Sequence, residues 1–216
     1  MKLHLGCGEK YLKGFVNIDF PSKFHTIQNK SVADKYANIF ELKYKKDSIE
    51  EIRLHHVFEH FERSIALGLI AGWRSWLKKD GILRIEVPDF DRSIGRVLNF
   101  FSDERAKCVA LRHIFGSQEA SWAKHCEGWS PKRLKKILIL FGFNIVQITK
   151  NSWKNTYNFE IIATRIEEQF NQQKCEQIAK KILKKYLVDN SESELRLLSV
   201  WMNKFKKQIK QIWAMN

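Results

Sequence analysis

The sequence predicts an α/β fold with a doubly wound, mostly parallel sheet, and three observations support this prediction. Short apolar segments typical of strands alternate along the chain with longer segments of helical period. Strands that are joined through helices run parallel in one sheet. The last two strand candidates, residues 143–148 and 159–163, are joined by a loop of about ten residues instead, so they should pair antiparallel.

The predicted elements follow one another in a regular order. The first half of the chain contains strand candidates over residues 2–5, 15–18, 51–57 and, less regularly, 31–37. It continues with a helix over residues 62–79, Gly81 as the stop of that helix, and a strand over residues 82–87 that Pro88 closes. The next helix has Ser130 as its N-cap, Pro131 in its first position and Gly142 after its end.

The C-terminal part of the chain has a different character. After Thr164 the apolar residues recur only at helical spacing. Ser191-x-x-Glu194 matches a capping box at the start of a last helix. We therefore expect one domain over residues 1–165 and a C-terminal appendage of two helices over residues 166–216.

The composition excludes several classes of protein. The chain has no run of about 18 apolar residues, so no membrane span is predicted, and its N-terminus lacks the pattern of a signal peptide. The four cysteines lie far apart and form no C-x-x-C pair, which indicates free thiols in a reducing compartment. We therefore expect a cytoplasmic protein, either free or peripheral at the inner membrane.

The net charge of +14 is the one unusual bulk property of the chain. Such a charge favours acidic partners, for example RNA, an anionic membrane surface or a phosphate-bearing substrate. The basic residues are spread along the chain and no single block carries them. A solvated basic surface is therefore at least as consistent with the sequence as a binding patch.

A glycine turn and an acidic residue predict a ligand site at the ends of the first two strands. Gly6 and Gly8 form a Gly-x-Gly turn where backbone can approach a ligand, and Asp19 can accept both hydroxyls of a ribose. Tyr11 occupies the place of the third glycine of a dinucleotide fingerprint, and only ten residues separate Gly8 from Asp19. The turn therefore suits an adenosine ligand without phosphates better than NAD, and a plain tight turn beside a surface Asp is the alternative.

Further motifs come in a fixed order and together resemble one family. They are LGCG at residues 5–8, GFVNID at 14–19, HVFEH at 56–60, LKKDGIL at 77–83 and VPD at 87–89. This set resembles the small bacterial class I S-adenosylmethionine-dependent methyltransferases of the type 11-like group, whose patterns read GCG…GWxNxD, HxLEH and LKPGG…VPD. The resemblance covers residues 2–165 and implies a seven-stranded sheet with an antiparallel last strand.

The resemblance also implies where S-adenosylmethionine would bind. By position, the turn Gly6, Cys7 and Gly8 would approach the amino-acid half of the cofactor, Asp19 its ribose, Asn38 and Ile39 its adenine, and His56 the region of its methyl group. The chain departs from the family pattern at two positions. Asp80 replaces a proline in a turn, and Asn38 replaces an Asp, which puts the adenine contact in doubt, although an amide can both donate and accept.

No metal site is expected from the sequence. His56-x-x-Glu59-His60 matches the inverted zinc-protease pattern, but both histidines would have to share one helical face and the segment follows an extended apolar run. Capping of the next helix and hydrogen bonding to loop backbone are the alternative roles for Glu59 and His60. The spacing of Cys108, His113, His125 and Cys126 fits no standard zinc finger.

The segment over residues 113–129 is predicted to hang over the methyl end of the cofactor. Its mixture of aromatic and polar residues, Trp122 and His125 among them, suits a ring-shaped acceptor such as a sugar, and an ordinary packed loop is equally supported. A hydroxyl acceptor needs a base, and the candidates are His125, His60 and His56, the first two being preferred.

The predicted activity is methyl transfer to an oxygen or nitrogen atom. The resemblance favours O-methylation of a saccharide in surface polysaccharide biosynthesis. The net charge favours an RNA methyltransferase as the alternative, and a non-catalytic cofactor-binding scaffold is the third hypothesis. The apolar face of the last helix includes Trp201, Phe205 and Ile209 and must be covered by its own domain, by a second copy in a homodimer, or by an anionic membrane.

Overall fold

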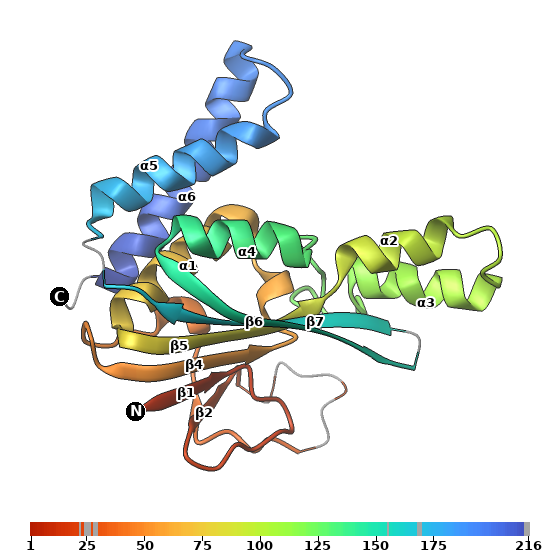
Figure 1. Ribbon diagram of the computed structural model, residues 1–216, viewed down its shortest axis with the longest axis horizontal. Helices are drawn as coiled ribbons and strands as arrows, with labels where there is room; N and C mark the ends of the chain where they lie inside the picture. The colour runs from red at the N-terminus through yellow and green to blue at the C-terminus, as the bar shows by residue number, and fades with distance from the viewer. Residues whose placement is uncertain (22, 24–26, 28–29, 155, 168–169, 214–216) are drawn as a thin grey trace.

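The computed structural model describes residues 1–21, 23, 27, 30–154, 156–167 and 170–213, and within them seven strands form one sheet (Figure 1). The strand order is β3-β2-β1-β4-β5-β7-β6. The strands are β1 (Lys2–Leu5), β2 (Val16–Asp19), β3 (Lys35–Tyr36), β4 (Ile49–His55), β5 (Leu77–Pro88), β6 (Phe143–Trp153) and β7 (Thr156–Arg165). The α-helices are α1 (Arg63–Trp76), α2 (Phe90–Leu98), α3 (Glu104–Phe115), α4 (Pro131–Leu140), α5 (Gln172–Leu183) and α6 (Glu192–Trp213).

The pairing of the strands confirms the predicted fold. β1, β2, β3, β4 and β5 pair parallel to one another, whereas β7 is antiparallel to both β5 and β6. The chain moves from β1 outward through β2 to β3 and then returns to place β4 on the other side of β1. Ligands of open α/β sheets bind at such a switch point, outside the carboxyl ends of the strands.

The two faces of the sheet differ in what they carry. α1, α4, α5 and α6 lie on the same side of the sheet in Figure 1, where the large side chains of the core are buried. Glu51 of β4 pairs with Arg84 of β5, Arg84 pairs with Glu160 of β7, and Glu160 also pairs with Arg53 of β4. Alternating apolar and charged positions along β4, β5 and β7 therefore separate the core from an ion-pair network.

The predicted boundary between α1 and β5 is wrong by several residues. The helix ends at Trp76, and Leu77 already pairs with Ile49 of β4, before regular pairing resumes from Ile82. The left-handed residue in this bulge is Asp80, with φ of 60°, and not the predicted stop Gly81. Asp tolerates this conformation better than most residues with side chains, so the turn does not need glycine there.

Two further stretches differ from the prediction. The ten-residue loop predicted before β7 is mostly strand, because β6 continues to Trp153 and pairs there with Thr156. The helices α2 and α3 were not predicted, although each has an N-cap signal in the sequence. The carboxylates of Asp89 and Asp103 accept hydrogen bonds from the backbone at the starts of α2 and α3, respectively.

The predicted C-terminal helices are present and pack on the rest of the chain. α6 crosses α1 so closely that a Cβ on Gly68 would lie 2.9 Å from Gln208, and one on Gly72 would lie 2.5 Å from Ile212. Phe205 and Ile209 are fully buried in the common core, so the chain itself covers this part of the apolar face. No helix among the described residues is long and apolar enough to cross a bilayer.

The predicted capping box at the start of α6 does not form, although the helix begins where it was expected. The carboxylate of Glu194 accepts the backbone N–H of Val188 at 3.0 Å instead of that of Ser191. The backbone N–H of Ser191 is bound by Asp189 at 2.8 Å. Glu194 therefore closes the preceding turn rather than the helix terminus itself.

Candidate functional site

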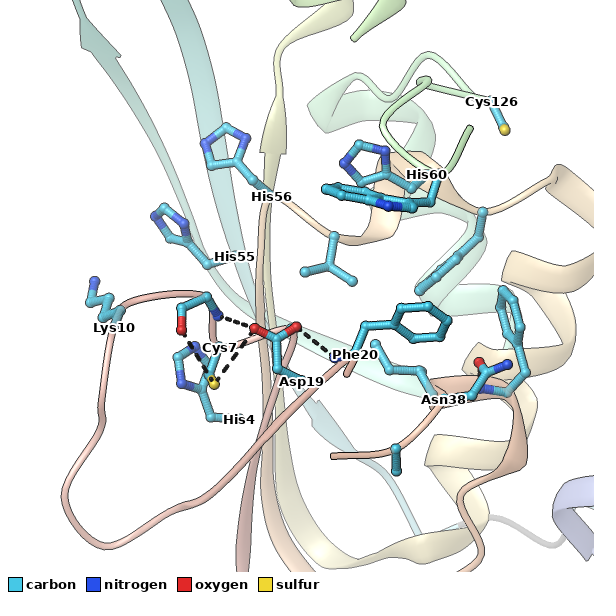
Figure 2. Close-up of a pocket in the computed structure, with 18 of the residues that line it drawn as sticks. His4, Cys7, Lys10, Asp19, Phe20, Asn38, His55, His56, His60 and Cys126 are labelled. Atoms are coloured by element: carbon cyan, nitrogen blue, oxygen red, sulfur yellow. Dashed lines mark hydrogen bonds between the residues drawn. The ribbon is translucent and has the colours of Figure 1, made fainter. Parts of the chain in front are cut away.

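A cavity of about 1000 Å³ opens at the carboxyl ends of β1, β2 and β4 (Figure 2). Every cofactor residue expected from the sequence lies in its lining, namely Gly6, Cys7, Gly8, Asp19, Asn38, Ile39 and His56. Figure 2 shows Asp19 and Asn38 in the lower part of the view and His56 and His60 in the upper part. The volume is at the upper end of the range for small-molecule sites, roughly 300–1000 Å³.

The glycine turn after β1 is fixed by a close contact with the turn after β4. Gly6 has φ of 66°, and a Cβ on it would lie 2.3 Å from a methyl carbon of Val57. Gly8 also has positive φ, of 56°, but a Cβ there would meet nothing within 4 Å. Gly6 is therefore required by packing, whereas Gly8 exposes its backbone to the cavity.

Asp19 connects this turn to the cavity. Asp19 is only 5% exposed, and its two carboxylate oxygens accept hydrogen bonds from the backbone N–H groups of Gly8 and Phe20, each at 2.8 Å. A carboxylate oxygen can accept more than one hydrogen bond, so the group suits a ligand with vicinal hydroxyls as well. Burial, together with the charge of Asp19, raises the pKa of the Cys7 thiol to about 12, so this cysteine is a packed, protonated group.

The far wall of the cavity is apolar and was only partly predicted. Ile39 was expected, but the aromatic side chains of Phe20, Phe40 and Phe61 were not. Asn38 caps the short helix η2 (Ile39–Glu41) by accepting the N–H of Phe40 at 3.1 Å, which leaves its amide NH₂ as a donor. A flat heteroaromatic ring fits such a wall, with one amide at its edge.

A second cavity of about 460 Å³ adjoins the first. The two share the lining residues His56, His60, Glu119 and Trp122. The second cavity is also lined by Glu59, His113 and His125. The three histidines predicted as catalytic candidates are thus brought together from two distant segments, His56 and His60 after β4 and His125 after α3.

His56 lies where the two cavities meet. It is held with φ of 55°, which is rare for a residue with a side chain, and its Nδ1 lies 3.3 Å from Oε1 of Glu59. Burial on its own lowers the pKa of His56, but the hydrogen bond and charge of Glu59 and the charge of Glu86 raise it above the ordinary value. The carboxylate thereby orients the imidazole and makes its other ring nitrogen more basic.

Glu59 is a buried carboxylate surrounded by histidines. It is 2% exposed in the short helix η3 (Phe58–His60). Burial raises its pKa, but His56, His60 and His125 outweigh this and hold the pKa below its usual range. The predicted capping of the next helix is not seen, because α1 has no side-chain cap. The predicted hydrogen bond to loop backbone is made by His60, whose Nδ1 lies 3.0 Å from the carbonyl oxygen of Lys124. The sequence signal that could have indicated a buried carboxylate among histidines is the position of Glu59 between the two histidines of HVFEH.

The loop between α3 and α4 separates into a core part and a cavity part. Trp129 is 1% exposed and stacks on Phe58 at a ring distance of 5.0 Å, so it belongs to the core. Trp122 lines both cavities. A bridge between Gly116 and Lys124 closes the loop and presents His125 to the second cavity.

No protein-family model matches the chain, and the comparison with curated proteins finds no relative. Among solved structures, the chain is similar to the S-adenosylmethionine-dependent methyltransferase of Methanosarcina mazei, with 14% identity, a TM-score of 0.50 and coverage of 77% of this chain and 92% of that one. The chain is also similar to an S-adenosylmethionine-dependent methyltransferase of Mesorhizobium loti, with 12% identity, a TM-score of 0.51 and coverage of 76% of this chain and 90% of that one.

A third similar structure contains ligands. It is the 1,6-didemethyltoxoflavin-N1-methyltransferase of Burkholderia thailandensis with bound 1,6-didemethyltoxoflavin and S-adenosylhomocysteine. Its identity to this chain is 11%, the TM-score is 0.51, and the match covers 77% of this chain and 71% of that one. At such low identities the similarity establishes the fold alone, and the chemistry has to be inferred from the residues of the site.

Proposed function

We infer that this chain, which has the fold of the class I S-adenosylmethionine-dependent methyltransferases, is itself such a methyltransferase. The observation that carries the inference is the pair of joined cavities. One has a glycine turn, a ribose-type carboxylate and an aromatic wall, and the other has a cluster of histidines. Two reactants held in adjoining cavities meet where the linings are shared, at His56, His60, Glu119 and Trp122.

The residues of the first cavity fit S-adenosylmethionine. The bare backbone at Gly8 would hold its amino-acid half, Asp19 its ribose hydroxyls, and the wall of Phe20, Ile39 and Phe40 its adenine. When bound, this cofactor supplies a methyl group that its sulfonium already activates. The protein therefore has two tasks, which are alignment of the acceptor and removal of a proton where the acceptor is a hydroxyl.

His56 is the best-placed base for a hydroxyl acceptor. It lines both cavities, and its Nδ1 is engaged with Glu59, so that Nε2 is the nitrogen that can take a proton. The sequence favoured His125 or His60 for this role. Each of these donates through Nδ1 to a backbone carbonyl, that of Lys124 for His60 and that of His113 for His125. Among the described residues, no carboxylate lies at hydrogen-bond distance to orient either of them.

We further propose a saccharide or another small hydroxylated ring as the acceptor. The lining of the second cavity combines Trp122 and Trp153 with the polar side chains of Arg112, Glu119 and Thr156. Aromatic faces and convergent polar groups are the usual means of binding a sugar ring. The size of about 460 Å³ suits one or two rings better than a nucleic-acid strand.

Transfer of a labelled methyl group tests the function and the acceptor class together. The purified protein is incubated with methyl-labelled S-adenosylmethionine and, separately, with polysaccharide, small-molecule and RNA fractions of a bacterial extract. Label in the saccharide or small-molecule fraction is the expected result. Label in RNA alone would contradict the acceptor class, binding of S-adenosylhomocysteine without labelling of any fraction would favour a non-catalytic scaffold, and absence of binding would refute the function.

A further inference from the structure

The cluster of Glu59, His60 and His125 enters the proposed methyl transfer only through the contact of Glu59 with His56. Each of the three residues of the cluster offers one possible metal-ligand atom, and the three atoms lie within 4.8 Å of one another. The cluster is built by tertiary structure. The backbone N–H of Cys126 donates to the carbonyl of Glu59 at 2.8 Å, which fixes the loop of His125 beside η3.

The hydrogen bonds of the two histidines define which ring nitrogen faces the cluster. Nδ1 of His60 lies 3.0 Å from the carbonyl oxygen of Lys124, and Nδ1 of His125 lies 2.9 Å from that of His113. A carbonyl oxygen only accepts, so both Nδ1 atoms carry the hydrogen. In each neutral ring, Nε2 then has the lone pair. Histidines that bind metals usually show this arrangement, with the second ring nitrogen donating to a carbonyl or carboxylate.

Glu59 supplies the charged ligand. Its Oε2 is buried and has no hydrogen-bond partner among the described residues, and its Oε1 lies 3.9 Å from Nε2 of His125. Oε1 already lies 3.3 Å from Nδ1 of His56, so Oε2 is the oxygen left for a ligand. A buried carboxylate oxygen without a partner is unfavourable, and a cation bound by Oε2 and by the imidazole lone pairs would satisfy it.

We propose that Glu59, His60 and His125 bind one divalent transition-metal ion of the zinc class. Two imidazoles and one carboxylate are ligands that such ions prefer, whereas magnesium and calcium prefer oxygen alone. Ligand atoms about 2.1 Å from a tetrahedral ion are about 3.4 Å apart, so the observed limit of 4.8 Å requires a closure of at most about 1.4 Å. This proposal replaces the expectation from sequence that the chain has no metal site.

A neighbouring cluster of His55, His56 and Glu86 is a weaker candidate. Its ligand atoms also lie within 4.8 Å of one another. Oε1 of Glu86, however, is already bound by Nε2 of His55 at 3.2 Å and by the amide of Asn151 at 3.3 Å. This second cluster therefore lacks the buried carboxylate oxygen without a partner that Oε2 of Glu59 provides.

The position of the proposed site indicates what else the ion would bind. Glu59, His60 and His125 all line the second cavity, so a fourth coordination position would open into it. Sites with three protein ligands and one open position bind water or an oxygen of a substrate. The site would thus take a hydroxyl or carboxylate oxygen of the molecule in the second cavity.

Metal binding can be measured without knowledge of the acceptor and does not depend on methyl transfer. The full chain is dialysed against a chelator and then titrated with Zn²⁺ by calorimetry and with Co²⁺ by visible absorption. One ion per chain is the expected stoichiometry. His125→Ala and Glu59→Gln should each weaken Zn²⁺ binding by at least about 100-fold, because loss of a ligand should cost no less than loss of a supporting partner.

His113→Gln is the matched control. His113 lines the same cavity, but its Nε2 is held by the carbonyl of Tyr157 and the side chain of Asn158, and the substitution keeps a donor. Zn²⁺ affinity should therefore stay within a few-fold of the wild type. Thermal unfolding of each metal-free variant shows that it is folded, and His60→Ala replaces Glu59→Gln if the latter is not.

Each outcome decides the proposal. Stoichiometric Zn²⁺ binding that the ligand variants lose and the control keeps supports it. Absence of binding by the wild type, or equal loss in His113→Gln, overturns it. Because binding of S-adenosylhomocysteine is measured separately, a failure of the metal site is distinguishable from a failure of the proposed function.

Discussion

The two cavities of this protein are built in opposite ways. The larger one is made chiefly by residues near the N-terminus, from His4 to Phe40, and by the turn that follows β4. The smaller one combines residues 56–60 with residues 109–125 and 153–156, which are far apart in the sequence. The first site can be recognised from local motifs, whereas the second exists only after the α3–α4 loop and the β6–β7 hairpin have been placed.

Replacement of His56 by alanine should distinguish the functions of the two cavities most clearly, because it should lower turnover and leave cofactor affinity nearly unchanged. A general base contributes about 10²–10⁴-fold to turnover, so His56→Ala should lower the rate by that factor while S-adenosylhomocysteine affinity changes little. Initial rates with the acceptor fraction and calorimetry with the cofactor product measure the two effects. Full activity in this variant would show that alignment alone carries the chemistry and that His56 has no role as base.

Gly6→Ala should act on both cavities at once. The left-handed conformation costs about 1–2 kcal/mol for a residue with a side chain, and overpacking costs about 1–3 kcal/mol, so the free energy of unfolding should fall by about 2–5 kcal/mol. The added methyl group would press on Val57, which follows His56 directly. Urea denaturation measures this loss.

Gly8→Ala is the control for this effect. It has the same backbone conformation but open space at the Cβ position, so only the conformational cost of about 1–2 kcal/mol applies to its stability. Equal losses of stability in the two variants would show that the contact between Gly6 and Val57 is not what requires the glycine.

Asp19→Ala is the counterpart of the His56 variant in the larger cavity. A hydrogen bond to a charged group contributes about 1.5–3 kcal/mol, so the affinity for S-adenosylhomocysteine should fall by roughly 10–150-fold. Asp19 also holds the N–H of Gly8, and Asp19→Asn, which keeps one acceptor oxygen, should lose less. Calorimetry on both variants measures the series, and unchanged affinity in Asp19→Ala would remove Asp19 from the binding site.

The sequence predicted the sheet and the larger cavity well for a physical reason. Gly6, Gly8 and Asp19 act through backbone conformation and through the hydrogen bond between Gly8 and Asp19, and all three residues lie within one short segment of the chain. The aromatic wall was missed because Phe20 and Phe61 look like any core residue in a sequence. Their role depends on which side of the turn faces the cavity, and a pattern of residues does not contain that information.

The second cavity was predicted only as a set of candidate histidines. For HVFEH the sequence predicts a strand end whose last residues cap the next helix or bond loop backbone, because a pattern shows spacing and not which residue is buried. In the fold, Glu59 is enclosed by three histidines that come from two segments. The unpredicted helices α2 and α3 set the position of His125, so its distance to Glu59 was beyond any local inference.

The smallest expected effect concerns α6, which lies behind the larger cavity. Nε2 of the buried Gln208 donates to the carbonyl of Phe40 at 3.1 Å, and Phe40 belongs to the cavity wall. Gln208→Ala should lower the free energy of unfolding by about 0.5–1.5 kcal/mol, the value of one hydrogen bond, and weaken S-adenosylhomocysteine binding by less than about tenfold.

The exposed neighbour Lys207 on the same helix provides the control, since Lys207→Ala should change neither quantity. The division into a domain over residues 1–165 and an appendage over residues 166–216 stays a prediction that this pair can sharpen. A modest loss of stability with nearly intact affinity means that α6 supports the wall from behind and that the site is complete without it. Loss of cofactor binding in a folded Gln208→Ala variant would instead make α6 part of the site, because a change at the helix would then reach the ligand through a single backbone carbonyl.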